Sequence, residues 1–142
     1  MTVIHSSNVL LEDIFVSSTS NSSASASNTD GVDTIYANNI TFNRWTVTNG
    51  DDAISPKANS TNILVTNSTF NKGNGIALGS IGQYDGVYET IENFTATDIV
   101  CNGTLHAAYM KTWTGQQVGY PPNGGGGGLG CTVTLLTPES KH

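Results

Sequence analysis

Short segments of apolar and β-branched residues recur along the chain, and four of them open with an asparagine. Their first residues are Asn8, Asn39, Asn62 and Asn93, separated by 31, 23 and 31 positions. Two further sets of short apolar segments recur in the same order: 14–16, 45–47 and 68–70, then 32–35, 53–55, 75–78 and 108–111. Helical periodicity is nearly absent, so these segments are predicted to be β-strands.

The three sets define a repeat of about 21–23 residues, lengthened by insertions at 17–27 and around 81–86. Three short strands per repeat, with asparagine at the corners, are typical of a parallel β-helix. In that fold each coil lies about 4.8 Å from the next. We therefore predict an all-β solenoid of about four to five coils over residues 1–130, as part of a larger domain. An immunoglobulin-like sandwich is the alternative, because it also contains short strands at regular spacing.

Composition excludes several kinds of partner. A chain of 142 residues suits one domain, and 48 of its residues are Asn, Ser or Thr. The net charge is −6 with only five Lys and Arg, so no basic patch can neutralise the phosphates of a nucleic acid. No apolar run approaches the roughly 18–20 residues of a membrane span. Because no residues follow metal-ligand spacing, we expect neither a metal nor a cofactor.

The sequence favours an origin in a secreted protein. Six sequons for N-glycosylation occur, more than chance predicts, at Asn21, Asn39, Asn59, Asn67, Asn93 and Asn102. The first residues lack the basic start and apolar stretch of a signal peptide, so we expect an internal piece of a secreted chain, monomeric when complete. Whether Cys101 and Cys131 pair is left open. Residues 131–142 show no coil pattern and are expected to lie outside it.

Carboxylates recur at one position of the repeat. Asp30 precedes Asp51 by 21 residues, and Asp52 follows directly, so stacked coils bring the three together. Asn74 and the segment 109–111 fall at the same place in the next two coils. Three adjacent carboxylates repel one another, so at least one is expected to have a raised pKa and to hold a proton near neutrality. Such a set equips a protein for glycoside hydrolysis. Taken singly, each aspartate would fit an ordinary turn.

Four sequence motifs in order resemble those of glycoside hydrolase family 28, the polygalacturonases and rhamnogalacturonan-degrading enzymes. They are Asn-Thr-Asp-Gly at 28–31, Gly-Asp-Asp at 50–52, Gly-Asn-Gly-Ile-Ala-Leu-Gly-Ser at 73–80 and Tyr-Met-Lys at 109–111. The resemblance covers roughly residues 3–130 and implies a right-handed parallel β-helix. It also implies an inverting mechanism in which Asp51 protonates the leaving oxygen, while Asp30 and Asp52 hold and deprotonate the attacking water. An inverting enzyme needs a gap of roughly 6.5–9.5 Å between acid and base.

Departures from the family pattern point to a particular substrate. Asn74 stands where the family usually has histidine, and Tyr109 stands where it usually has arginine. The family's arginine grips a galacturonate carboxylate, whereas a tyrosine ring suits a neutral, partly apolar sugar such as rhamnose. Lys111 remains available for a galacturonate across the bond. Two cysteines common in the family are replaced together, by Ala53 and Phe70.

The residues at 79–84 resemble the exo-acting fungal branch of the family, and Gln83 within them is a candidate for substrate binding along with Asn74, Tyr109 and Lys111. We therefore predict an α-L-rhamnosidase or exo-acting rhamnogalacturonan hydrolase with a pectic substrate. An exo-polygalacturonase is the nearest alternative. A non-catalytic carbohydrate-binding solenoid and a structural or adhesive solenoid are the others.

Overall fold

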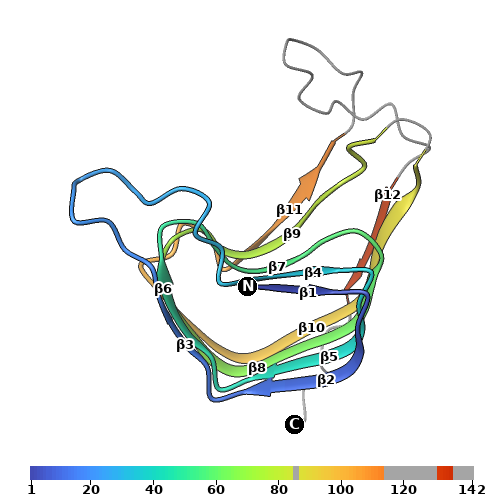
Figure 1. The fold of residues 1–142 in the computed structure, drawn as a ribbon, viewed down its shortest axis with the longest axis horizontal. Helices are drawn as coiled ribbons and strands as arrows, with labels where there is room; N and C mark the ends of the chain where they lie inside the picture. The colour runs from blue at the N-terminus through green and yellow to red at the C-terminus, as the bar shows by residue number, and fades with distance from the viewer. Residues whose placement is uncertain (85–86, 114–130, 136–142) are drawn as a thin grey trace, which may run out of the picture.

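The computed structural model describes residues 1–84 and 87–113 of the chain, together with the backbone of residues 131–135. These residues form strands joined by turns and loops (Figure 1). No helix in this part of the chain is long and apolar enough to cross a membrane.

The strands wind into a solenoid with three faces. One face is a parallel sheet of β1 (Thr2–Ile4), β4 (Val32–Ile35), β7 (Asp52–Pro56), β9 (Gly75–Ile81) and β11 (Ala108–Thr112). The opposite face contains β2 (Ser7–Glu12), β5 (Asn38–Asn43), β8 (Ser60–Lys72), β10 (Glu89–Asn102) and β12 (Cys131–Leu135). On the third side, β3 (Phe15–Ser17) pairs with β6 (Thr46–Asn49), which pairs with the second half of β8.

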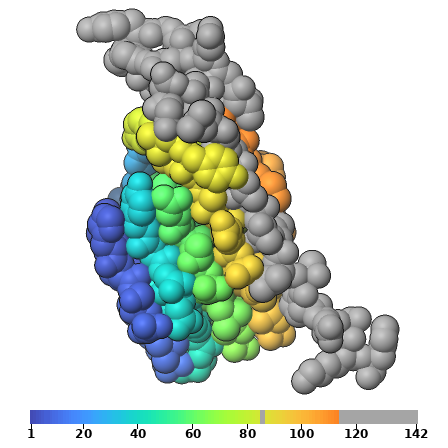
Figure 2. All heavy atoms as spheres, turned by 90° about the vertical axis from the view of Figure 1, so that its right-hand side faces the viewer, coloured from blue at the N-terminus to red at the C-terminus, as the bar shows by residue number. Residues whose placement is uncertain are grey.

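Every pairing in these sheets is parallel, and successive coils lie side by side as bands from blue to orange (Figure 2). The predicted parallel β-helix is therefore confirmed. Parallel pairing excludes the sandwich alternative, whose sheets are antiparallel. The insertion after β3 projects from the solenoid as a loop and returns to it where β4 begins (Figure 1).

The recurring asparagines form a corner of the solenoid. Asn8, Asn39, Asn62 and Asn93 align in register and have φ values of 57°, 56°, 54° and 54°. Asparagine enters this left-handed region more readily than most residues. Asn39 donates from Nδ2 to Oδ1 of Asn8 at 2.7 Å, and Asn93 donates to Asn62 at 3.0 Å. The corner thus turns the chain and links consecutive coils.

Apolar side chains fill the interior between the three faces. The largest of them is Trp45, which meets Phe42 edge to face and donates from Nε1 to the Leu11 carbonyl at 2.8 Å. Ala53 and Phe70, at the positions of the family's missing cysteines, are both buried in this core. Packing of apolar groups therefore occupies the place of the absent disulfide.

The segment after residue 130 differs from expectation in part. β12 pairs with β10 in parallel, with Cys131 opposite Glu89, so its backbone extends the second face. The three consecutive β-branched residues at 132–134 suit a strand, even though the segment lacks the asparagine corner. Residues 136–142 lie outside the described part. Cys101 is exposed and free, and the side chain of Cys131 lies outside the described part.

Candidate active site

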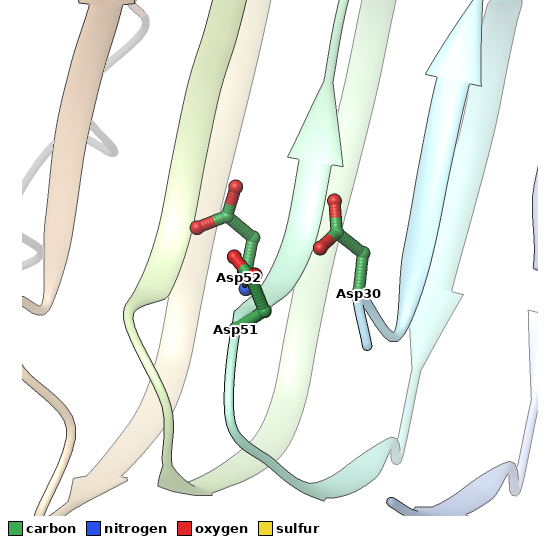
Figure 3. Close-up of side chains that lie close together, drawn as sticks. All are labelled: Asp30, Asp51 and Asp52. Carbon is green, nitrogen blue, oxygen red and sulfur yellow. Dashed lines mark hydrogen bonds between the residues drawn. The ribbon is translucent and has the colours of Figure 1, made fainter. Parts of the chain in front are cut away.

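Three aspartates meet where β4 and β7 begin. Asp51 and Asp52 lead into β7, and Asp30 lies just before β4 on the neighbouring coil (Figure 3). One carboxylate oxygen from each lies within 4.8 Å of the others. This distance joins the nearest oxygens, so the carboxyl groups themselves are further apart, and the gap expected for an inverting acid and base stays a prediction.

A local irregularity in β7 places the Asp52 side chain at this site. Asp52 pairs with Gly75, but Ile54 pairs with Ile76, so β7 has one extra residue relative to β9. Such bulges re-aim side chains next to functional sites. On the other side, Val32 pairs with Ile54, an offset of 22, which aligns Asp30 with Asp52 rather than with Asp51.

Asp52 is fully buried and held by three donors from two neighbouring coils. Tyr109 and Asn74 donate to its Oδ1, and the Lys111 ammonium lies 2.9 Å from Oδ2. Burial by itself would raise the pKa of Asp52, but the hydrogen bonds from Tyr109, Lys111 and Asn74 outweigh it and lower that pKa. Asp52 is therefore an ionised group at neutral pH.

Asp30 has the opposite environment. Burial, followed by the charges of Asp33 and Asp52, raises its pKa to about 6, against a lowering by Lys57. The Lys57 ammonium lies 3.0 Å from Asp33 and 3.7 Å from Asp30. The cluster therefore contains the expected raised pKa, and it is that of Asp30.

Asp51 is fixed by neighbouring amide groups. The Asn28 N–H donates to Oδ2 at 2.7 Å, and the Asp52 N–H donates to Oδ1 at 2.9 Å. Asn74 donates from Nδ2 to Asp51 Oδ1 at 3.0 Å and to Asp52 Oδ1 at 3.1 Å. Asn74 thus bridges the two carboxylates from the next coil and aligns them without supplying a proton.

The predicted substrate-binding residues fall in two places. Tyr109 and Lys111 on β11 reach over β9 to Asp52, so their polar ends are occupied within the protein. Burial and the hydrogen bond to Asp52 raise the pKa of Tyr109, so its hydroxyl stays protonated. Gln83 instead lines a cavity of about 340 Å³ with Tyr36 and Lys57, and none of the three aspartates lines that cavity.

Sequence reasoning missed Asp33 and Lys57. Both are half-buried and form an ion pair beside Asp30. The alternation of strand β4 carried a signal, because Val32 and Thr34 are fully buried in it and Asp33 therefore faces outward. No such signal exists for Lys57, because this residue follows the end of β7 and its side chain reaches back along the sheet to Asp33 and Asp30.

Within the described part of the chain, Asp30, Asp51 and Asp52 are the one group of possible metal ligands that lie close enough together to hold a cation. The ammonium groups of Lys111 and Lys57 already lie beside Asp52 and Asp30. These lysines provide the positive charge that a carboxylate cluster needs.

Four of the six sequon asparagines are hydrogen-bonded to an asparagine of the preceding coil. Asn39, Asn67, Asn93 and Asn102 each donate Nδ2 to an asparagine of the preceding coil, at 2.7–3.2 Å. Asn59 accepts a hydrogen bond from the Thr90 N–H, and Asn21 lies exposed in the serine-rich insertion. Modification at these sites stays a prediction.

Comparison with known proteins identifies the family. A model described as glycosyl hydrolases family 28 matches residues 1–120. Alpha-L-rhamnosidase rgxB of Aspergillus niger is 57% identical over 141 residues, which cover 99% of this chain and 33% of that protein. Exopolygalacturonase X of the same organism is 42% identical over 138 residues, covering 97% and 32%. Putative galacturan 1,4-alpha-galacturonidase A of Aspergillus niger is 40% identical over 136 residues, covering 88% and 31%.

No solved structure was found to match the chain. The chain spans about a third of the length of the curated relatives it matches. The family match covers most of the chain, and the order of the four motifs agrees with it. The chain therefore belongs to glycosyl hydrolase family 28.

Proposed function

We propose that the protein hydrolyses the terminal α-L-rhamnosyl bond of a pectic polysaccharide. The observation that carries this proposal is the charge of the aspartate cluster. Lys111 pairs with Asp52, and Lys57 pairs with Asp33 and Asp30, so neither lysine is free for a substrate carboxylate. A sugar over the cluster meets an excess of carboxyl groups, which disfavours galacturonate and suits a neutral sugar.

Tyr109 supports the same choice. Its hydroxyl is used by Asp52, so the side chain offers a sugar its ring rather than a charge. Rhamnose has an apolar 6-methyl group, which suits an aromatic face. The relative with 57% identity is named an alpha-L-rhamnosidase.

The catalytic roles follow in part from the environments of the aspartates. Asp30, with a pKa of about 6, is suited to accept the proton of an attacking water above that pH. Asp52, ionised and immobile, helps to hold the water. The role of Asp51 as proton donor rests on the family resemblance. Inversion of the anomeric configuration rests on it too. If Asp30 instead holds the proton for the leaving group, Asp51 takes over the base role.

Proton NMR of rhamnose-ended rhamnogalacturonan oligomers incubated with the protein tests the substrate and the stereochemistry together. We expect free rhamnose to appear first as the inverted anomer. The retained anomer would contradict inversion, and release of galacturonate from oligogalacturonate would favour the exo-polygalacturonase alternative, which the 42% identical relative supports. Binding without any product would favour the carbohydrate-binding alternative.

Two variants separate the acid from the base. A p-nitrophenol leaving group departs without a proton, so an enzyme lacking its acid keeps activity on p-nitrophenyl rhamnoside but loses it on the natural oligomer. We expect this pattern for Asp51→Asn and a loss on both substrates for Asp30→Asn. The reverse pattern would exchange the two roles.

The compartment of action is part of the proposal. Six sequons favour a secreted parent protein that meets its substrate outside the cell. Peptide mass spectrometry of the protein isolated from its source tests this, because glycans at the sequons require passage through the secretory pathway.

A further inference from the structure

Lys72 differs from the other basic residues of the described part of the chain. Lys57, Lys111 and Arg44 each form an ion pair with one or more carboxylates. Lys72, exposed at the end of β8, forms none with the residues of 1–84 and 87–113. It is therefore a cation whose charge stays available to a ligand.

A polar pocket lies beside this lysine. Its volume is about 210 Å³, and it lies between the serine-rich insertion and the turns after β6 and β8. Its wall includes four serines of the insertion, Asn49, Gly50, Lys72 and Gly73. No carboxylate is among the residues that line it, so the charge of the pocket is positive where that of the aspartate cluster is negative.

An unused acceptor lies in the wall of this pocket. Asn49 is 2% exposed, and its Nδ2 donates to the carbonyls of Thr29 and Asp52, both at 2.8 Å. Its Oδ1 is buried next to Gly73 and accepts no hydrogen bond. Buried polar atoms are rarely left unpaired. This unpaired acceptor belongs to a residue that lines the pocket.

The pocket adjoins the proposed proton donor. Gly50 in its wall precedes Asp51, and Gly73 packs so closely that an added Cβ would clash with the Asp51 carbonyl. Asn74, the next residue, donates to both Asp51 and Asp52. The oxygen that Asp51 would protonate joins the rhamnose to the next sugar. That next sugar must therefore lie close to Asp51.

We propose that this pocket binds the uronic-acid unit to which the departing rhamnose is attached, with Lys72 pairing with the sugar's carboxylate. That the bound sugar is the one attached to rhamnose rests on the proposed function. That the pocket binds a uronate rests on Lys72 and on the lining of the pocket. Serine hydroxyls face the ring hydroxyls, while the ammonium of Lys72 faces the carboxylate. The neutral sugar and the charged sugar thereby occupy sites of opposite charge, on the two sides of Asp51.

Kinetics with matched substrates test this arrangement. The substrates are a rhamnose-ended rhamnogalacturonan oligomer and the same oligomer with its carboxyl groups methyl-esterified. For Lys72→Gln we expect KM for the acid oligomer to rise about tenfold, as loss of one charged contact does, and to rise much less for the ester. Lys72→Arg should restore the preference for the acid. Arg44→Gln removes the same charge at the far Asp13 corner and should change neither KM.

A binding measurement separates this proposal from the proposed function. In amide NMR spectra of the protein titrated with digalacturonate, we expect shifts at Lys72, Gly73, Gly50 and the insertion, and none with the methyl ester. Absence of these shifts, or equal shifts with the ester, overturns the pocket even if rhamnose is released. Shifts without any turnover support the pocket and count against the hydrolase alone. An unchanged KM ratio between acid and ester in Lys72→Gln also overturns it.

Discussion

The hydroxyl of Tyr109 on β11 donates a hydrogen bond to Oδ1 of Asp52 on β7, although 57 positions separate the two residues. Strand β9 lies between them, and the residue of β9 opposite Tyr109 is the small Ala77. The tyrosine therefore reaches across one strand and joins the Asp52 carboxylate to a ring two coils away. It holds Asp52 ionised and adds no charge to the cluster.

Tyr109→Phe should shift the pH dependence of activity. The replacement removes one of the donors that stabilise the Asp52 carboxylate, so the pKa of Asp52 rises towards its usual value. We expect kcat/KM to fall about tenfold, the effect of losing a hydrogen bond to a charged group, and the acidic limb of the profile to move to higher pH. Rates between about pH 3 and pH 8 measure this shift.

The matched control for this experiment is Tyr36→Phe. Tyr36 lies in the turn after β4, stacked on His5 at 5.0 Å between ring centroids, and is 45% exposed. Its replacement should leave the profile unchanged. A profile for Tyr109→Phe that coincides with that of the unmodified protein would show that the hydrogen bond does not set the charge of Asp52.

Asp30→Asn should make the protein more stable at neutral pH. The pKa of Asp30 is raised to about 6 in the folded state, mainly by burial, so the folded protein binds more protons than the unfolded chain between about pH 4 and pH 6. The free energy of unfolding therefore falls as the pH rises through this window. An asparagine avoids the charge, so we expect a gain of about 1–3 kcal/mol at pH 7 and little change near pH 4.

Urea unfolding at these two pH values measures the effect. Asp52 has a lowered pKa and makes the opposite contribution, which is lost only as the pH falls below about 4. Asp98→Asn, at an exposed corner of β10, is the control and should change stability equally at both pH values. If the free energy of unfolding changes between pH 4 and pH 7 by the same amount in Asp30→Asn as in the native protein, the pH dependence belongs to groups other than Asp30.

The architecture could be predicted from the sequence because its corners repeat. Asn8, Asn39, Asn62 and Asn93 keep their places despite insertions of different length, since each fills a left-handed turn that few other residues tolerate. The same register predicts that Asp30, Asp51 and Asp52 lie together. A period and a turn residue are local signals, so the sequence displays them directly.

The partners within the site could not be predicted in this way. Lys111 and Asp52 are 59 positions apart, and their contact depends on a bulge in β7 that the sequence pattern does not reveal. The pKa of Asp30 is raised first by its burial and then by the charge of Asp33, and both depend on the direction in which single side chains point. The edge strand β12 was missed for a related reason, because pairing at a sheet edge depends on the neighbouring strand.

Asn62→Ala and Asn62→Gly should separate the two roles of a corner asparagine. Asn62 donates to Asn38 at 2.8 Å, accepts from Asn93 at 3.0 Å and has a φ of 54°. Glycine removes the hydrogen bonds, at a cost of about 1 kcal/mol, and adds freedom to the unfolded chain, whereas alanine removes the same bonds and bears about 1–2 kcal/mol of backbone strain. Urea unfolding should therefore rank the native protein above Asn62→Gly and Asn62→Gly above Asn62→Ala. Alanine equal to glycine would show that the left-handed turn is relaxed at this corner.

Gly75→Ala should disrupt the sheet that carries the candidate active site. Gly75 has a φ of +88°, and an added Cβ would clash with the backbone carbonyl of His106 on the next coil. Gly103 has a similar φ of +68° but no atom within 4 Å of an added Cβ, so Gly103→Ala isolates the backbone strain. We expect a loss of about 1–2 kcal/mol for Gly103→Ala and of about 3 kcal/mol or more for Gly75→Ala, because β11 must move away from β9.

Urea unfolding gives the two losses, and the pH dependence of activity reports whether Tyr109 still reaches Asp52. A shifted β11 separates these side chains, so Gly75→Ala should reproduce the profile of Tyr109→Phe, whereas Gly103→Ala should keep the native profile. Equal losses of stability in the two variants, with native profiles in both, would mean that the coil carrying His106 moves outward at little cost and that β9 does not fix the distance between Tyr109 and Asp52.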